Sequence, residues 1–414
     1  MKIYNIKDFG AIADGKTLAT KAIQDAIDEA AENGGGKVVI EGGEYLSARI
    51  DLRSNVELHI DAGATLKATT DGEEFKEIES DFWITEMAPR RNRKCFIYAE
   101  NCQNIALTGR GKIDCQGRFA VAPDEKPGLW AYKRVVFNLP ARMIFFIGCK
   151  DVLCEDVLLY EPCSGWGYWI CDCDRVTMRG LRIDSNRNYP NADGIHINSS
   201  RDVTVSDCDI TAGDDAIVVR AYNGVLRNPK ACERIAVTNC NLSSFTSCIR
   251  IAWIGDGTIR DCVFSNLTFT NSNTGIGMTI PGNPDGNPSR FTDDGGEATL
   301  IENLSFNNIA INTTFNQPIM ISVADGNKIN AIRNIRFSNI TSYSGKFPSI
   351  NMKKGVLADH VTFSGCSFTL REFDAIDGFV PRSSNIVADP KAGETPVFNG
   401  VRDLRLVGTT FSAE

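Results

Sequence analysis

VTVSDCDI, at residues 203–210, is the segment that decides the fold, because its pattern returns along the chain. It consists of a short alternating strand, a polar two-residue corner and a second short strand. The pattern recurs at VLCEDVLL (152–159), VTMRGLRI (176–183), IAVTNCNL (235–242), LSFNNIAI (304–311), IRFSNITS (335–342) and VTFSGCSF (361–368). Self-similarity of this kind is typical of repeat architectures.

A second set of short strands alternates with the first. Its members are WGYWIC (166–171), DGIHIN (193–198), DAIVVR (215–220), SCIRIA (247–252) and TGIGMT (274–279). Because no helices separate the two sets, they predict a solenoid of parallel strands stacked about 4.8 Å apart. A sandwich or barrel would instead show two-residue hairpin turns. The sequence therefore predicts an all-β, right-handed parallel β-helix.

We expect this solenoid to form one domain over residues 1–414. Its parts would be an N-terminal cap over about 1–45, coils over about 46–370, and a C-terminal coil and tail over about 371–414. TKAIQDAIDEAAENGG at 20–35 has apolar residues at helical spacing and a glycine stop, which predicts a helix. That helix would cover the open end of the solenoid, where an exposed edge strand invites aggregation.

Composition and charge limit the classes of function that the protein could have. A net charge of −8 over 414 residues gives no electrostatic footprint for nucleic acid. No run approaches the ~20 apolar residues of a membrane span. The first residues lack an apolar signal core, so we expect a cytoplasmic protein, or a secreted or periplasmic one whose signal was trimmed. Among the 14 cysteines, Cys208, Cys240 and Cys366 occupy aliphatic positions of the repeat, which predicts mostly free, buried thiols.

Alignment of the second strand set sorts its side chains into columns. A uniformly apolar column, which we predict to face the core, comprises Ile195, Ile217, Ile249 and Ile276. Side chains alternate across a strand, so the residues between these are expected to face outward. One such outward column comprises Trp169, His196, Val218, Arg250 and Gly277, and the next comprises Cys171, Asn198, Arg220, Ala252 and Thr279.

Three aspartates converge at the entries of two of these strands. Asp193 and Asp215 fall in one column, 22 residues or one coil apart, and Asp214 projects beside them. Aspartate is common at coil corners, but these residues are in register beside arginines. Because like charges repel, the cluster is expected to raise one pKa for acid chemistry, or to hold a water or a metal.

Two motifs one coil apart carry a resemblance to a known family. They are NADGIHI (191–197), where the family has Asn-Thr-Asp-Gly, and GDDAIVVR (213–220), where it has Gly-Asp-Asp. DFGAIADGKT (8–17) and IYAENCQNIALTGRGKIDCQG (97–117) also fit its pattern. Over most of its length the chain resembles glycoside hydrolase family 28, the polygalacturonase and rhamnogalacturonase group of the pectin lyase-like β-helix superfamily.

The resemblance implies a hydrolase that inverts the anomeric centre of a plant or algal, pectin-like polysaccharide or oligosaccharide. It implies that Asp214 is the general acid and that Asp193 and Asp215 hold the attacking water. Inversion requires room for that water between the acid and base carboxyl groups. No cofactor and no metal are predicted.

Two departures from the family pattern bear on the substrate. Thr246 stands where the family has the histidine of Gly-His-Gly, and residues 277–279 lack both cations of its Arg-Ile-Lys. In the family those cations grip the carboxylate of a galacturonate ring, so polygalacturonate is predicted to be a poor substrate. Arg250 offers a partial substitute, and Trp169 could stack on a sugar face. The residues predicted to bind substrate are Asn191, His196, Arg220, Arg250, Trp169 and Thr246.

Two other functions stay open at this point. A polysaccharide lyase or epimerase on the same fold would use Arg220 or Arg250 as its base, with the aspartates holding Ca²⁺. A lyase would leave an unsaturated product and lose activity in EDTA. The chain could also be a non-catalytic carbohydrate-binding relic. In each case the partner is a carbohydrate, with no nucleic acid or membrane, and the sequence does not indicate an oligomeric state.

Overall fold

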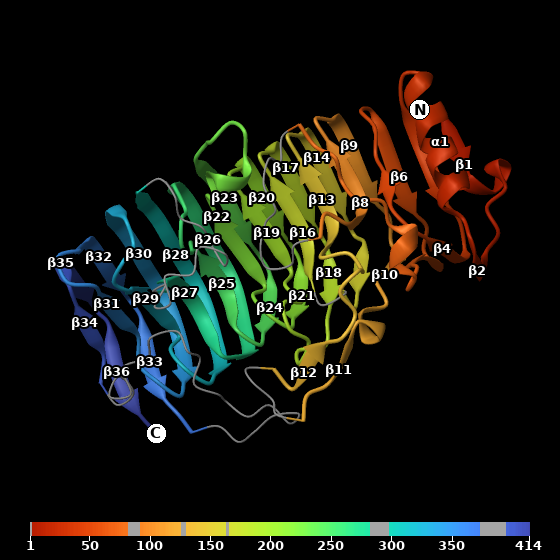
Figure 1. Cartoon of the computed structure of the whole chain (residues 1–414). Helices are drawn as coiled ribbons and strands as arrows, with labels where there is room; N and C mark the ends of the chain where they lie inside the picture. The colour runs from red at the N-terminus through yellow and green to blue at the C-terminus, as the bar shows by residue number, and fades with distance from the viewer. Residues whose placement is uncertain (1, 82–91, 126–129, 163–164, 282–297, 373–394) are drawn as a thin grey trace. The chain divides into compact units, whose positions relative to one another are not determined.

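The computed structural model describes residues 2–81, 92–125, 130–162, 165–281, 298–372 and 395–414. In these residues the regular secondary structure is almost entirely β-strand, with one α-helix, α1 (Thr20–Glu32) (Figure 1). The backbone divides into two compact units. The first holds residues 1–196 and 200–213, and the second holds residues 197–199 and 214–414. Both are wound from parallel strands as a right-handed β-helix, which confirms the predicted fold.

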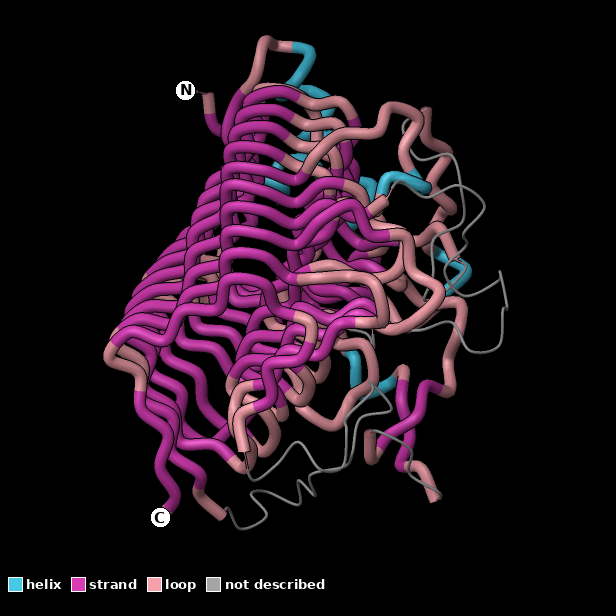
Figure 2. Tube along the Cα trace, turned by 90° about the vertical axis from the view of Figure 1, so that its left-hand side faces the viewer, coloured by secondary structure: helices cyan, strands magenta, loops and turns pink. Residues whose placement is uncertain are grey.

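In the first unit, successive coils pair in parallel, strand upon strand (Figure 2). One row of strands comprises β1 (Ile3–Asn5), β3 (Gly36–Ile40), β6 (Val56–Ile60), β9 (Gln103–Thr108), β14 (Lys150–Glu155), β17 (Asp174–Arg179) and β20 (Arg201–Ser206). A neighbouring row comprises β2 (Asp14–Leu18), β4 (Gly43–Ser47), β7 (Ala64–Ala68), β10 (Lys112–Asp114), β15 (Leu158–Tyr160), β18 (Arg182–Asp184) and β21 (Asp209–Ala212). The other sheet comprises β5 (Ile50–Asp51), β8 (Cys95–Glu100), β13 (Arg142–Ile147) and β16 (Trp166–Cys171).

The second unit repeats this plan. One parallel sheet comprises β22 (Ile217–Arg220), β25 (Ser247–Ile251), β27 (Thr274–Ile280), β29 (Ile319–Val323), β31 (Ser349–Met352) and β34 (Val397–Asn399). The other comprises β23 (Cys232–Thr238), β24 (Asn241–Ser244), β26 (Thr258–Ser272), β28 (Thr299–Thr314), β30 (Ile329–Ser344), β32 (Ala358–Ser364), β33 (Ser367–Leu370), β35 (Val401–Val407) and β36 (Thr410–Ala413). β19 (Ile195–Asn198) contributes two residues to each unit.

The remaining elements are short. The part of the chain that the structure describes has four 3-10 helices, η1 (Ile6–Phe9), η2 (Gly72–Glu74), η3 (Gly117–Phe119) and η4 (Asn223–Val225). β11 (Val121–Pro123) and β12 (Tyr132–Arg134) pair in antiparallel fashion outside the coils.

Asparagine makes corners of the coils, including bends inside the long strands β26 and β28. Asn266 and Asn308 have φ of 55° and 54°, in the left-handed region that asparagine tolerates better than most residues. Their side chains stack from coil to coil, with Asn308 Nδ2 donating to Asn266 Oδ1 at 2.7 Å. Asn334 donates to Asn303 in the same way at 3.0 Å. The polar corner of the sequence repeat is therefore a left-handed turn whose side chain bonds to the adjacent coil.

The core consists of stacked columns of like side chains. Ile217 pairs with Ile249 and Ile249 with Ile276, and all three are fully buried, as predicted. Ile195 is also fully buried, within the first unit. An aromatic column in the second unit stacks with ring centroids 4.7 to 5.1 Å apart and comprises Phe264, Phe306, Phe337 and Phe363.

Helix α1 covers the first coils, as the sequence predicts. Its apolar face buries Ile23, Ile27 and three alanines, and the helix contacts β3, β5 and β6. It ends at Glu32, and Gly34 follows with φ of 87°, a conformation that suits glycine. No helix in the described part of the chain is long and apolar enough to cross a membrane.

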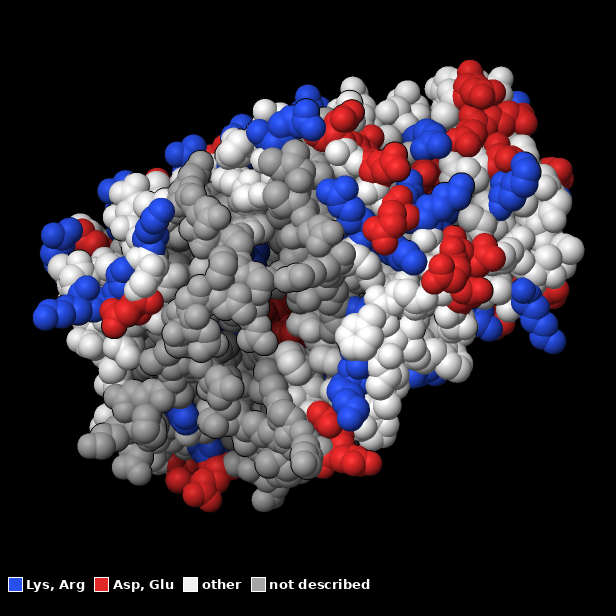
Figure 3. All heavy atoms as spheres, viewed as in Figure 1, with Lys and Arg blue, Asp and Glu red and all other residues white. Residues whose placement is uncertain are grey.

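On the face drawn in Figure 3, basic and acidic side chains are interspersed. Ion pairs also join neighbouring coils, such as Arg175 Nε with Asp151 Oδ1 at 2.6 Å. The thirteen described cysteines are all buried and unbridged, in agreement with the predicted free thiols, and Cys163 lies outside the described residues. The sequence also predicts a Gly- and Pro-rich insertion at 281–296, of which residues 282–296 lie outside the described residues. Residues 373–394 of the predicted C-terminal tail lie outside them too.

Candidate active site

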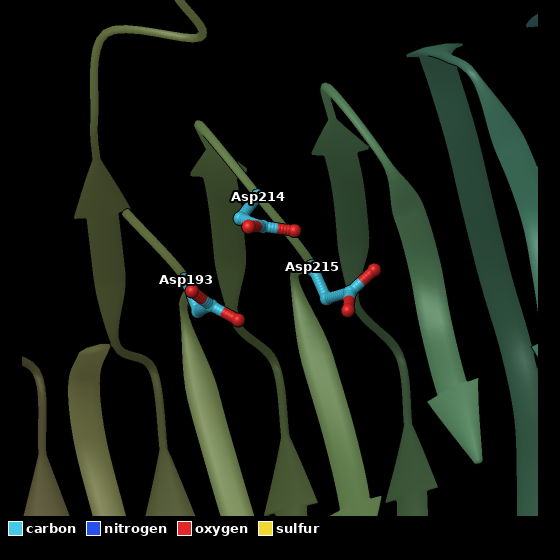
Figure 4. A group of neighbouring side chains, drawn as sticks. All are labelled: Asp193, Asp214 and Asp215. Atoms are coloured by element: carbon cyan, nitrogen blue, oxygen red, sulfur yellow. The ribbon is translucent and has the colours of Figure 1, made fainter. Parts of the chain in front are cut away.

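Asp193 belongs to a buried polar cluster of the first unit. It lies in the turn before β19 (Figure 4), and its Oδ2 accepts a hydrogen bond of 2.8 Å from His196 Nε2. The imidazole of His196 stacks on the indole of Trp166, with centroids 4.0 Å apart and an interplanar angle of 16°. All three side chains are buried. The ring contact and the carboxylate together determine the orientation of His196, which was expected to face solvent and does not.

Backbone contacts with β16 hold this turn in place. Gly167 N donates to Asp193 O and Tyr168 N donates to Gly194 O, both at 2.9 Å. A Cβ atom on Gly167 would lie 2.7 Å from Gly194 O, so only glycine fits there. Asn191, predicted to bind substrate, is half-buried with φ of 53° and forms part of the turn itself. Sequence reasoning missed Gly167, although a glycine inside a strand is a signal of close backbone approach.

Asp214 and Asp215 lie in the turn before β22, in the second unit (Figure 4). A carboxylate oxygen of one lies within 4.8 Å of a carboxylate oxygen of the other. Their environments differ, since Asp214 is half-buried and Asp215 is buried. The residue before them is Gly213, whose carbonyl accepts a 2.7 Å hydrogen bond from the indole of Trp130. No sequence signal pointed to Trp130, which is 83 residues away.

Asp215 is surrounded by hydrogen-bond donors. Its Oδ1 accepts from Ser247 N at 3.0 Å and from Arg250 Nη2 at 3.3 Å, and its Oδ2 accepts from Arg250 Nε at 3.1 Å. A backbone N–H and a guanidinium that donate to both oxygens of a carboxyl group stabilise its charged form. These contacts suit Asp215 to hold negative charge.

Thr246 joins the two aspartates. Its Oγ1 lies 2.8 Å from Asp214 Oδ1 and 2.6 Å from Asp215 Oδ1, and the residue is 9% exposed. Ser244 positions it, because Ser244 Oγ accepts from Thr246 N at 2.9 Å and donates to the carbonyl of Asp214. The residue that replaces the family's histidine is therefore bound to two candidate catalytic groups.

Arg250 alternates with the core residues Ile249 and Ile251, as its predicted outward position requires, but its own side chain is buried as well. Besides Asp215, its guanidinium bonds to the hydroxyl of Thr279, where the family has a lysine. A Cβ at Gly277 would lie 3.0 Å from Ser247 Oγ and 3.7 Å from Arg250 Nη1, so glycine leaves room for this arrangement. The guanidinium that was expected to bind substrate is instead bound to the protein.

Arg220 also differs from its predicted role. It forms a bidentate ion pair with Asp256, with Nε at 2.6 Å from Oδ2 and Nη2 at 2.7 Å from Oδ1. Asp256 is fully buried and accepts in addition from Trp253 N at 3.0 Å. Burial raises the pKa of Asp256, and the Arg220 guanidinium opposes that shift. The predicted outward cation is thus one half of an internal ion pair.

Trp169 cannot stack on a sugar in this structure. It is fully buried, its ring lies parallel to that of Phe145 at 4.3 Å, and the guanidinium of Arg142 lies 4.7 Å from its centroid. The prediction that Trp169 is open to a sugar ring was wrong, because Phe145 and the buried guanidinium of Arg142 cover its indole. Burial lowers the pKa of Arg142 to about 10.

Comparison with solved structures shows which fold the chain has. An exopolygalacturonase from Thermotoga maritima has a TM-score of 0.75 and 20% identity, covering 99% of this chain and 92% of its own. A family 28 exopolygalacturonase from Yersinia enterocolitica has a TM-score of 0.75 and 19% identity, covering 99% and 75%. The fold is the parallel β-helix that these polygalacturonases share.

Sequence comparison makes the assignment more specific. The model of glycosyl hydrolases family 28 matches residues 37–375, so the chain belongs to that family. A probable polygalacturonase from Vitis vinifera is 25% identical over 286 residues, which is 66% of this chain and 56% of that protein. An endo-polygalacturonase from Pectobacterium carotovorum subsp. carotovorum is 29% identical over 221 residues, 51% of this chain and 53% of that protein. The matches thus span little more than half of these relatives.

Proposed function

We propose that this protein is an inverting glycoside hydrolase acting on pectin-like carbohydrate, with Asp214 as the general acid. The observation that carries the proposal is the unequal setting of Asp214 and Asp215. Asp215 is buried among donors and suited to remain ionised, whereas Asp214 is half-buried and accessible to a leaving-group oxygen. Two neighbouring carboxyl groups in different environments are suited to separate acid and base roles.

Asp193 completes the proposed site. It precedes Asp215 by one coil in the sequence repeat, and within the first unit it is buried and hydrogen-bonded to His196. In the proposed reaction Asp193 and Asp215 orient one water, and Asp214 protonates the departing glycosidic oxygen. The product would carry the inverted anomeric configuration.

The arginines favour this function over elimination. A lyase on this fold would need Arg220 or Arg250 as a neutral base, yet each is ion-paired with a carboxylate, Asp256 or Asp215. The same pairing bears on the substrate, because neither guanidinium is available to grip a galacturonate carboxylate. Although the named relatives are polygalacturonases, we propose a neutral sugar, or an acidic sugar held differently, at the cleavage point.

The substrate proposal is tested by incubating the protein with polygalacturonate and with pectic oligosaccharides that contain neutral sugars. Reducing ends and unsaturated products are both measured, with and without EDTA. We expect reducing ends from the second group and little from polygalacturonate. Turnover of polygalacturonate at about 10 per second, an ordinary enzymatic rate, would contradict the substrate proposal. Unsaturated products would contradict hydrolysis itself.

The acid assignment is tested with Asp214→Asn, which removes the proton donor but keeps the side-chain shape. On a substrate with a poor leaving group, kcat/KM should fall by about 10²-fold or more. An activated aryl leaving group needs less protonation and should lose less. Asp193→Asn should impair both substrates comparably, because each still needs the water. Near wild-type activity in Asp214→Asn, or retention of the anomer by NMR, would exclude the proposed mechanism.

A further inference from the structure

The hydroxyl of Thr246 contacts more carboxyl groups than it has protons to donate. Its Oγ1 lies at hydrogen-bond distance from one oxygen of Asp214 and one oxygen of Asp215, yet a hydroxyl has a single proton to donate. If both carboxyl groups were ionised, one contact would bring a lone pair of the hydroxyl against a negatively charged oxygen. Two full hydrogen bonds form together only when one carboxyl group is protonated and donates to Thr246.

The neighbours of Asp215 indicate which carboxyl group carries that proton. Asp215 Oδ1 already accepts from the backbone N–H of Ser247, and Arg250 donates to both of its oxygens. These donors stabilise the charged form of Asp215. The arrangement that satisfies these contacts has Asp214 protonated and donating to Thr246 Oγ1, which in turn donates to Asp215.

We propose that Thr246 is a proton relay between Asp214 and Asp215, a role that rests on the acid and base assignments of the proposed function. Before the reaction the chain runs from Asp214 through Thr246 to Asp215. Cleavage moves the Asp214 proton to the glycosidic oxygen, and the attacking water gives one proton to Asp215 as its oxygen bonds to the anomeric carbon. The site then holds an ionised Asp214 and a protonated Asp215.

The relay returns the site to its starting state in one concerted shift. Asp215 gives its proton to Thr246 Oγ1 while the hydroxyl proton of Thr246 passes to Asp214, so the threonine is unchanged and no other reactant is needed. The geometry for this shift is held by the backbone. Thr246 N donates to Ser244 Oγ at 2.9 Å, and Thr246 O accepts from Thr274 N at 2.7 Å in the adjacent coil. Thr246 thus acts as a positioning residue that works through both aspartates.

The proposal is tested with Thr246→Val, which keeps the β-branched shape and removes the hydroxyl, and with Thr246→Ser, which keeps the hydroxyl. The probe is a mixture of pectin oligosaccharides, with kcat and kcat/KM measured from pH 3 to 9. In Thr246→Val we expect kcat to fall about 10-fold or more, at the lower end of proton-transfer effects. The alkaline limb of kcat/KM should move to lower pH, since protonated Asp214 loses its hydrogen-bond acceptor. Thr246→Ser should restore both properties.

A threonine with only a packing role would lower activity without moving the pH profile, and that result would overturn the relay. So would a kcat in Thr246→Val within two-fold of wild type. Should Thr246→Val fail to fold, Thr246→Ala serves as the second variant without a hydroxyl, judged by the same readouts. Asp214→Asn separates the two proposals. If it is inactive while Thr246→Val is unimpaired, only the relay fails, and if it is active, the proposed function fails as well.

Discussion

At the scale of the residue, buried ion pairs determine which charged side chains are available to a substrate. Arg220 lies close to the candidate site in sequence. Two nitrogens of its guanidinium donate hydrogen bonds to Asp256, which is fully buried. A buried charge that loses its partner is costly, whereas removal of both partners is much less so. Arg220 is therefore expected to contribute to stability rather than to substrate contact.

This expectation is tested by Arg220→Met. We expect the free energy of unfolding to fall by about 3–5 kcal/mol, because Asp256 is left unpaired in the interior. The double variant Arg220→Met/Asp256→Leu removes both charges and should recover a large part of that loss. Urea denaturation of the wild type and the two variants gives the comparison. If Arg220→Met kept its stability and lost substrate affinity instead, the original prediction of a substrate contact would be restored.

At the scale of the element, each strand contributes one side chain to a column that continues through its neighbours. In β28, Phe306 is stacked between Phe264 and Phe337, with centroid distances of 4.7 and 5.1 Å. Ser305, the preceding residue, points to the opposite face because side chains alternate along a strand. The two positions offer a matched comparison within one strand.

Phe306→Ala should lower the free energy of unfolding by about 3–5 kcal/mol, the cost of a large core cavity. Ser305→Ala should change it by about 0.5 kcal/mol or less, as expected for a substitution outside the core. Both values come from denaturant unfolding followed by circular dichroism. Equal effects at the two positions would mean that the aromatic column is not a continuous part of the core.

At the scale of the whole molecule, buried thiols make the free energy of unfolding depend on pH in the alkaline range. Burial raises the pKa of Cys154 to about 12 from 9.0, and burial also raises that of Cys262 and Cys366. Between pH 9 and about 12 the Cys154 thiol loses its proton in the unfolded chain and keeps it in the folded chain. The folded state then binds more protons, so the free energy of unfolding falls as pH rises from about 9 towards 12.

For one such thiol the decline is about 1.4 kcal/mol per pH unit. Urea unfolding under reducing conditions at pH 8, 9, 10 and 11 measures the total slope. Cys154→Ala should give a shallower slope by about that amount, and this difference separates the thiol from the tyrosines and lysines that titrate in the same range. Identical slopes in wild type and variant would contradict the prediction.

Local sequence determined most of the fold. The same parallel coil is predicted by the two-residue Asn and Asp corners, by the short alternating strands and by the apolar columns. Each neighbouring coil carries the same sequence pattern. For this reason the stacking of Ile217, Ile249 and Ile276 was predictable, as was the helix at Thr20–Glu32. The position of Asp214 and Asp215 before β22 also follows from sequence order alone.

Only the tertiary structure decided which polar side chains pair. Arg220 pairs with Asp256, which is 36 residues away, and Arg250 pairs with Asp215, which is 35 residues away. Thr246 contacts Asp214 and Asp215, each more than 30 residues away. The repeat assigns each residue a column and a face, but it does not say whether that face is covered or which distant group a flexible guanidinium reaches. Those outcomes depend on desolvation and ion pairing in three dimensions, because a charge removed from water must find its counter-charge wherever the fold places it.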